Sequence, residues 1–181
     1  LVHRDVKPGN ILLAPDGPRL IDFGIARAVD GSALTASGLV VGTPGFLAPE
    51  QARGEPATPS SDVFALGCVL AYAMAGRPPF GTGEPDALLY RTVHDEPDLD
   101  GVEAASRPLV ARCLDKDPEA RPTAAGTARQ LAEDVPDGAG WLPGPVAAMV
   151  NDVSGGLADP AMGGRAEHGG MLAGTVLREA G

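Results

Sequence analysis

The residues best suited to chemistry stand at the start of the chain, in His3-Arg4-Asp5-Val6-Lys7-Pro8-Gly9-Asn10. This stretch places a carboxylate (Asp5), an ammonium (Lys7) and an amide (Asn10) at short offsets, and a second carboxylate, Asp22, follows 12 residues after Asn10. A carboxylate can take a hydroxyl proton, amide and carboxylate oxygens suit Mg²⁺, and an ammonium can offset charge on a phosphoryl group. The spacing therefore predicts metal-assisted phosphoryl transfer.

A β-hairpin is predicted between these two groups of residues. Residues 11–14 form a short apolar run, Pro15-Asp16-Gly17-Pro18 is typical of a tight turn, and residues 19–21 return as the second strand. The second strand ends at Asp22. The hairpin therefore links Asn10 to Asp22 and explains how the two side chains could share one metal ion.

The sequence after residue 46 has the pattern of helices. Residues 47–54 predict a short helix, and residues 60–62 predict the start of a second helix that is apolar on nearly every face over 63–75. A helix of that kind is buried, so it should form the centre of the core. Further helices are expected over residues 86–93, 107–114 and 123–133, and residues 25–46 are expected to form a mobile loop.

Three motifs in register resemble the catalytic core of protein kinases. They are the loop His-Arg-Asp-x-Lys-x-x-Asn, then Asp22-Phe23-Gly24, then Ala48-Pro49-Glu50. The resemblance covers residues 1–135 and is to the C-terminal lobe of a eukaryotic-like (Hanks-type) serine/threonine kinase. Residues 45–54 and 77–80 look particularly like the bacterial members.

The resemblance implies a mainly α structure, the C-terminal lobe of the α+β kinase fold with its small β-hairpin. The N-terminal lobe would be missing from this chain. Residues 1–135 would be the C-lobe part of the catalytic domain. Residues 136–181, which are rich in Gly, Pro and Ala, are expected to be a disordered tail with at most one helical turn near 146–150.

The activity implied by the resemblance is transfer of the γ-phosphoryl group of ATP to Ser or Thr hydroxyls of proteins in bacterial signalling, with ATP and Mg²⁺ as cofactors. Asp5 would be the catalytic base. Lys7 would contact the γ-phosphate, and Thr43 would hydrogen-bond to the Asp5–Lys7 pair. Asn10 and Asp22 would hold Mg²⁺. Leu12 would line the floor of the adenine pocket.

Other residues of the family pattern imply structural and regulatory roles. Phe23 would pack against His3, and Asp62 would accept backbone N–H bonds from the catalytic loop. Arg4 resembles the arginine that pairs with a phosphorylated activation loop. The candidate phosphorylation sites in that loop are Thr35 and Ser37.

An ion pair between Glu50 and Arg121 is expected to join the end of the loop to the last helices.

The candidate site residues also have plain structural interpretations. The catalytic loop could be an ordinary polar turn, Asp22 an Asx turn at a strand end, Asp62 an acidic residue at a helix N-terminus and Leu12 a buried strand leucine.

Two other functions remain open from the sequence. A small-molecule phosphotransferase of the antibiotic type shares the His-x-Asp-x-x-x-x-Asn loop but lacks the segment from Gly42-Thr43-Pro44 to Glu50. A non-catalytic kinase remnant could act as a binding module, because this sequence has no Gly-rich phosphate loop and no lysine-bearing strand before the catalytic loop.

The same absence leads to an expectation about the 181-residue chain on its own. Without those parts it should neither bind ATP tightly nor phosphorylate a substrate. The apolar helix over 63–75 should be left with an exposed stripe.

The amino-acid composition limits the classes of molecule that this chain is expected to bind. The formal net charge is −10, from 24 acidic and 14 basic residues, which argues against nucleic acid as a partner. Protein substrates remain, and a kinase dimer for autophosphorylation is possible. Cys68 and Cys113 in apolar helices suggest reduced thiols and a cytoplasmic location, and no apolar run is long enough for a membrane span. Bacterial relatives often carry a membrane anchor, so the full-length parent could be anchored.

Overall fold

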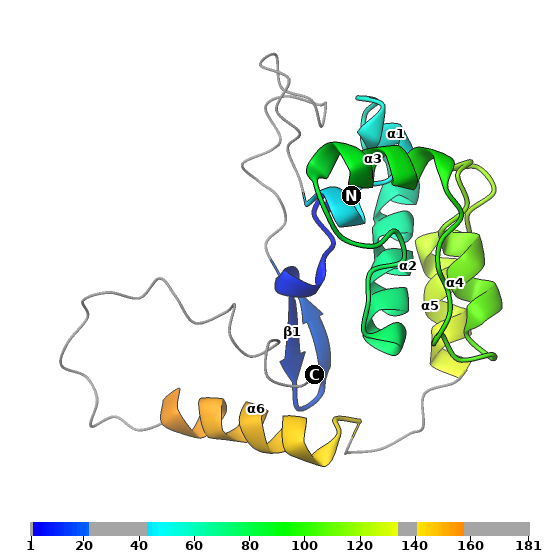
Figure 1. The fold of residues 1–181 in the computed structure, drawn as a ribbon. Helices are drawn as coiled ribbons and strands as arrows, with labels where there is room; N and C mark the ends of the chain where they lie inside the picture. The colour runs from blue at the N-terminus through cyan, green and yellow to red at the C-terminus, as the bar shows by residue number, and fades with distance from the viewer. Residues whose placement is uncertain (1, 22–42, 134–140, 158–181) are drawn as a thin grey trace. The chain divides into compact units, whose positions relative to one another are not determined.

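The computed structural model describes residues 2–21, 43–133 and 141–157 (Figure 1). The chain divides into two compact units. The first comprises Leu1–Asn10 and Ile21–Val135, and the second comprises Ile11–Leu20 and Pro136–Gly181. The sequence predicted a division at residue 135 but not that the hairpin would group with the C-terminal segment.

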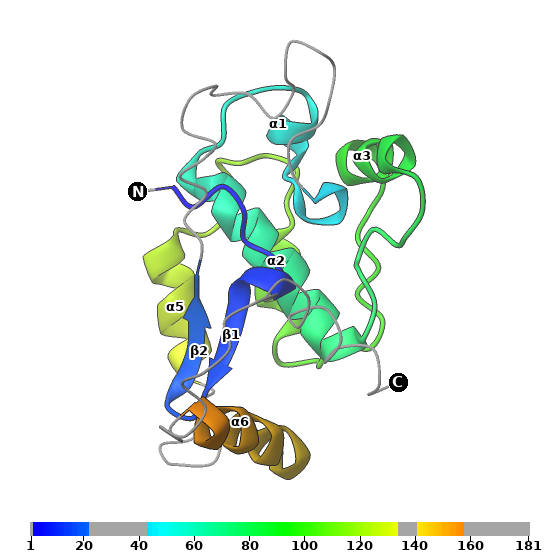
Figure 2. The same cartoon turned by 90° about the vertical axis from the view of Figure 1, so that its left-hand side faces the viewer.

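The first unit is built around the long helix α2, Pro59–Ala75 (Figure 2). It contacts α4, α5 and the 3₁₀ turn η3, whereas α3 contacts α1 and η3. The bounds of these elements are η3 Pro44–Phe46, α1 Pro49–Ala52, α3 Pro85–His94, α4 Arg107–Cys113 and α5 Ala124–Glu133. A further 3₁₀ turn, η1, covers Pro8–Asn10 in the catalytic loop.

Local signals explain both ends of α2. Thr58 is extended, Pro59 takes the first helical position, and the Ser61 hydroxyl accepts the Thr58 N–H at 2.9 Å. The helix therefore begins just before the predicted start at 60–62. It ends at Gly76, whose φ of 70° continues the chain in the left-handed region that favours glycine.

The core lies where α2 meets α4 and the loops around α3. Its fully buried residues include Phe64, Cys68, Ala71, Val110 and Leu114. The stripe predicted to be exposed on α2 is present only in part: Leu66, Leu70 and Met74 are half-buried and Ala73 is exposed, whereas the other large aliphatic and Phe side chains of this helix are buried.

Two cations enclose a pair of stacked aromatic rings in this core. The rings of Phe64 and Phe80 have centroids 5.8 Å apart and are inclined by 7°. The Lys116 ammonium lies 4.2 Å from the centroid of Phe80, and the Arg121 guanidinium carbon lies 4.9 Å from that of Phe64. Cation–π attraction of this kind stabilises desolvated charges. Burial lowers the pKa of Lys116.

The described strands of the second unit are β1, Ile11–Ala14, and β2, Gly17–Leu20, which pair antiparallel with Ile11 opposite Leu20 and Ala14 opposite Gly17. The turn is therefore shorter than predicted, and β2 starts at Gly17 instead of residue 19. Pro18 is tolerated in β2 because a strand of a two-stranded sheet has a free edge.

Helix α6, Gly144–Leu157, exceeds the single turn expected near 146–150 and lies within the segment predicted to be a disordered tail. Partly buried Val146, Ala147 and Val150 follow a helical spacing. Before the helix, the Trp141 indole N–H is shared between the carbonyl oxygens of Ala14 and Pro15, at 3.1 and 3.2 Å. These contacts, which composition does not reveal, give the segment structure. Residues 158–181 lie outside the described residues.

Candidate active site

The carboxylate of Asp5 is held by two side chains of its own loop. One of its oxygens, Oδ2, lies 3.0 Å from the Lys7 ammonium and accepts the Asn10 amide N–H at 3.0 Å. The same amide nitrogen donates to the Asp5 backbone carbonyl at 2.8 Å. The turn η1 places Asn10 for this contact, since the Asn10 N–H donates to the Lys7 carbonyl at 3.0 Å. Asp5, Lys7 and Asn10 therefore form one cluster of contacting side chains.

Asp62, at the start of α2, fixes the backbone before Asp5. Its two carboxylate oxygens accept the N–H groups of His3 at 2.6 Å and Arg4 at 2.8 Å, as the sequence predicted. Arg4 has a φ of 70°, which is uncommon for a residue other than glycine. Such a conformation persists only where surrounding contacts impose it. Asp62 thus fixes the backbone conformation of the two residues that precede Asp5.

Asn10 is buried and is suited to bind a metal ion. Because its Nδ2 donates to Asp5, its Oδ1 is directed elsewhere and can serve as an oxygen ligand, a type that Mg²⁺ prefers. The N–H of Ile21 donates to the Asn10 carbonyl at 2.9 Å, and His3 Nε2 lies 3.1 Å from the Ile21 carbonyl. Ile21 directly precedes Asp22. Among the described residues, which exclude Asp22, no group of three or more acidic, His or Cys residues could hold a metal ion.

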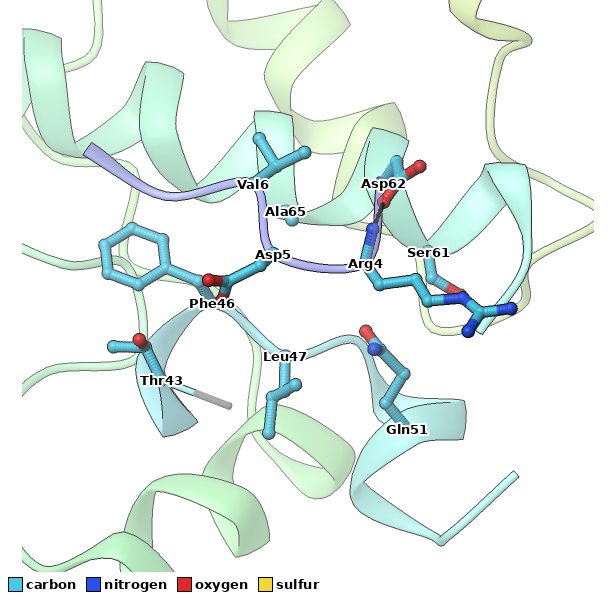
Figure 3. A pocket seen from close by; sticks show the side chains of 10 residues that line it. All are labelled: Arg4, Asp5, Val6, Thr43, Phe46, Leu47, Gln51, Ser61, Asp62 and Ala65. Atoms are coloured by element: carbon cyan, nitrogen blue, oxygen red, sulfur yellow. Dashed lines mark hydrogen bonds between the residues drawn. The ribbon is translucent and has the colours of Figure 1, made fainter. Parts of the chain in front are cut away.

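Two cavities adjoin this loop. The smaller, of about 10 Å³, has space for about one water molecule. Figure 3 shows three of its side chains at one end, from Asp5, Thr43 and Phe46, and three at the other, from Arg4, Ser61 and Asp62. The larger cavity, of about 310 Å³, includes Lys7, Thr43 and Phe46 in its lining. Thr43 and Phe46, from η3 and the residue before it, line both cavities.

The predicted ion pair of Glu50 and Arg121 is present and buried. Arg121 donates to both carboxylate oxygens, at 2.8 and 2.9 Å, and the Ser61 hydroxyl donates to Oε1 of Glu50 at 2.7 Å. Burial by itself would raise the pKa of Glu50, but the hydrogen bonds from Arg121 and Ser61 outweigh it and hold this pKa below its ordinary value. Arg121 also donates to the carbonyl oxygens of Ser60 and Asp115. The pair therefore ties α1 to the start of α2 and to the loop after α4.

Five other predicted site residues do not lie in the described part of the first unit. Leu12 lies in β1 of the other unit and is 53% exposed. Asp22, Phe23, Thr35 and Ser37 lie outside the described residues.

Sequence reasoning missed three contributors. Ser61 completes the Glu50 network, and Phe46 and Tyr72 line the larger cavity. Phe46, two residues before Ala48-Pro49-Glu50, could have been noted from that motif. Tyr72 gives no signal in the sequence beyond an apolar helix position.

One loop thus carries Asp5, Lys7 and Asn10, and Asp62 at the start of α2 joins that loop to the helices. A family model described as "Protein kinase domain" matches residues 1–133, and the chain belongs to this family.

Bacterial serine/threonine-protein kinases are among the curated relatives. The chain is 47% identical over 134 residues to the probable serine/threonine-protein kinase PkwA of Thermomonospora curvata, covering 74% of this chain and 18% of the relative. It is 41% identical over 152 residues to the serine/threonine-protein kinase AfsK of Streptomyces coelicolor, covering 79% and 19%. It is 40% identical over 129 residues to the serine/threonine-protein kinase PknB of Mycobacterium tuberculosis, covering 67% and 21%.

The chain thus spans about a fifth of the length of these relatives. None of the helices in the described ranges 2–21, 43–133 and 141–157 is both long and apolar enough to cross a membrane.

Proposed function

We propose that this chain carries the catalytic loop of a serine/threonine protein kinase that transfers the γ-phosphoryl group of ATP to hydroxyl groups of protein substrates. The observation that carries the proposal is the Asp5 carboxylate, bonded at 3.0 Å to Lys7 and at 3.0 Å to Asn10 in a protein-kinase-family chain. A carboxylate held in this way can orient a substrate hydroxyl and accept its proton as the new P–O bond forms. Lys7 can then leave Asp5 to offset charge on the transferred group.

The cofactors of the proposal are ATP and Mg²⁺. The free Oδ1 of Asn10 fits a hard cation, and Asp22 would supply a second oxygen ligand. When bound, Mg²⁺ neutralises charge on the phosphates during transfer. Leu12 is proposed to contact the adenine, and its exposure leaves it accessible for that contact.

Regulation is proposed through Thr35 and Ser37, whose phosphates, added by autophosphorylation in a dimer, would pair with Arg4. A cytoplasmic location is proposed because Cys68 and Cys113 are free thiols buried in the core. A protein acceptor is favoured over a small molecule, because the chain has the segment from Gly42-Thr43-Pro44 to Glu50 that the small-molecule enzymes lack, and Thr43 and Phe46 of this segment line the cavities beside the catalytic loop.

The test is phosphate transfer by the full-length protein that contains this chain. It would be incubated with radiolabelled ATP and Mg²⁺ and offered a generic basic protein or an aminoglycoside. We expect label on Ser and Thr of the protein, loss of that label in Asp5→Asn, and no label on the aminoglycoside. Label on the aminoglycoside alone would instead support the small-molecule phosphotransferase. If neither acceptor is labelled, the result would favour the third alternative, a non-catalytic binding module.

A further inference from the structure

The larger cavity beside the catalytic loop has a mainly apolar lining, which the phosphoryl-transfer reaction itself does not require. Its volume is about 310 Å³, and its wall includes Pro8, Phe46, Tyr72 and Pro78. Of the described residues in this lining, Lys7 alone is charged, and its ammonium lies 3.0 Å from Asp5. Among the described residues no acidic side chain lines the cavity, so a basic side chain would find no partner among them.

The position of the cavity ties it to the proposed reaction. Lys7 bonds to Asp5 with its ammonium and also lines the cavity, so the two places are separated by one side chain. An extended polypeptide advances about 3.3 Å per residue. A side chain within about three residues of the hydroxyl-bearing residue can therefore reach the cavity while that hydroxyl lies at Asp5.

We infer that this cavity selects acceptor polypeptides with a large apolar side chain, such as Leu or Phe, close to the phosphorylated Ser or Thr. The inference rests on the proposed function and adds the substrate class. Phe46 from η3, Tyr72 from α2 and Pro78 from the loop after α2 supply apolar surface to its lining. An apolar side chain gains from burial against them, whereas a Lys or Glu side chain loses hydration without a compensating partner.

The experiment uses the full-length protein and a set of peptides that each carry one Ser, with the three positions on either side varied among Leu, Phe, Lys and Glu. At one of these positions we expect Leu or Phe to raise kcat/KM by about tenfold or more over Lys, the range that apolar pockets give. In Tyr72→Glu, which places a carboxylate in the wall, the preference at that position should move to Lys. Tyr72→Phe should keep the apolar preference.

The matched control is Tyr90→Glu, since Tyr90 is a 63% exposed residue of α3 outside this cavity. It should leave the preference unchanged. If Tyr72→Glu does not fold, Pro78→Glu places a carboxylate on another part of the wall and should give the same reversal.

Two results would overturn the inference, and they are distinguishable. The first is Asp5-dependent phosphorylation with no apolar preference at any position, or with a preference that both folded Glu variants leave unchanged. This result would refute the inferred substrate class and would leave the proposed kinase activity supported. Absence of Asp5-dependent phosphorylation of every peptide removes the proposed function, and the inference with it.

Discussion

At the scale of single residues, the conformation of the catalytic loop depends on contacts among several polar side chains and not on one residue alone. Lys7 and Asn10 both bond to Asp5 Oδ2, and Asp62 fixes the two residues that precede Asp5. The spacing of the loop predicted which residue types would meet. It could not predict that the Asn10 amide would bond to Asp5, because that contact depends on the turn η1.

Replacing Asp62 tests how the loop is positioned. Asp62→Ala removes the acceptor of two backbone N–H groups and releases the φ of 70° at Arg4. We expect a loss of about 3–6 kcal/mol in the free energy of unfolding, since two hydrogen bonds to a charged group are lost and each contributes about 1.5–3 kcal/mol. The phosphorylation rate should also fall, with partial recovery in Asp62→Asn.

Urea unfolding and kcat would be measured together. Glu103→Ala is the matched control, because Glu103 is an exposed carboxylate and its removal should change stability by less than about 0.5 kcal/mol. Equal effects of Asp62→Ala and Glu103→Ala would show that the loop does not depend on Asp62.

At the scale of elements, helix packing is fixed by a few close contacts between segments far apart in the sequence. Glu50 and Arg121 are 71 residues apart, and only the family resemblance linked them in advance. Most helices were predicted to within a few residues from apolar spacing and from Pro and Gly at their ends. The pairing of Phe64 with Phe80 and the two cations beside them were not predictable, because they depend on how α2 and its following loop pack.

The buried ion pair should make stability depend on pH. The folded pKa of Glu50 is lowered, so its stabilisation is present above its ordinary value of 4.5 and is lost as pH falls through the lower folded value. At pH 7 Glu50→Gln should cost about 3–5 kcal/mol, because Arg121 is left buried without its partner. Urea unfolding at a series of pH values should show this cost shrink as the pH is lowered below 4.5. A cost that stays constant down to the acid unfolding of both proteins would contradict the assignment.

Gly67 sets the approach of α2 to α4. A Cβ atom at this position would lie 2.8 Å from Cys113 Cβ and 3.1 Å from Leu114, so the two helices would have to move apart. Gly67→Ala should therefore lower the free energy of unfolding by about 1–3 kcal/mol, as overpacking does. Thermal unfolding would be compared with Gly45→Ala, where nothing lies within 4 Å of the added atom. A Gly67→Ala protein as stable as Gly45→Ala would show that this contact is not tight.

At the scale of the whole molecule, the two compact units differ in how much apolar surface they bury. The first encloses the core around α2. In the second, Leu12, Leu13 and Leu20 of the hairpin are 53, 45 and 39% exposed, and a two-stranded sheet is only marginally stable by itself. The structured part of the C-terminal segment was underestimated from sequence because the contacts of Trp141 with the hairpin turn cannot be read from composition.

The two units should therefore unfold separately. Trp141 is the only tryptophan of the chain, so its fluorescence reports the second unit, while far-UV circular dichroism is dominated by the helices of the first. In urea we expect the fluorescence midpoint of the 181-residue chain to precede the dichroism midpoint. Coincident transitions would mean that the chain unfolds as one cooperative unit.

The most direct test of the account is the rate of phosphoryl transfer in Asp5→Asn of the full-length protein, measured in a single turnover together with ATP affinity. The proposed function gives Asp5 the role of proton acceptor, and in the structure its carboxylate contacts Lys7 and Asn10. We predict that Asp5→Asn slows transfer to a protein serine by about 10²- to 10⁴-fold, with ATP affinity changed less than about twofold. Transfer by Asp5→Asn at a rate within about threefold of the unmodified protein would contradict the account.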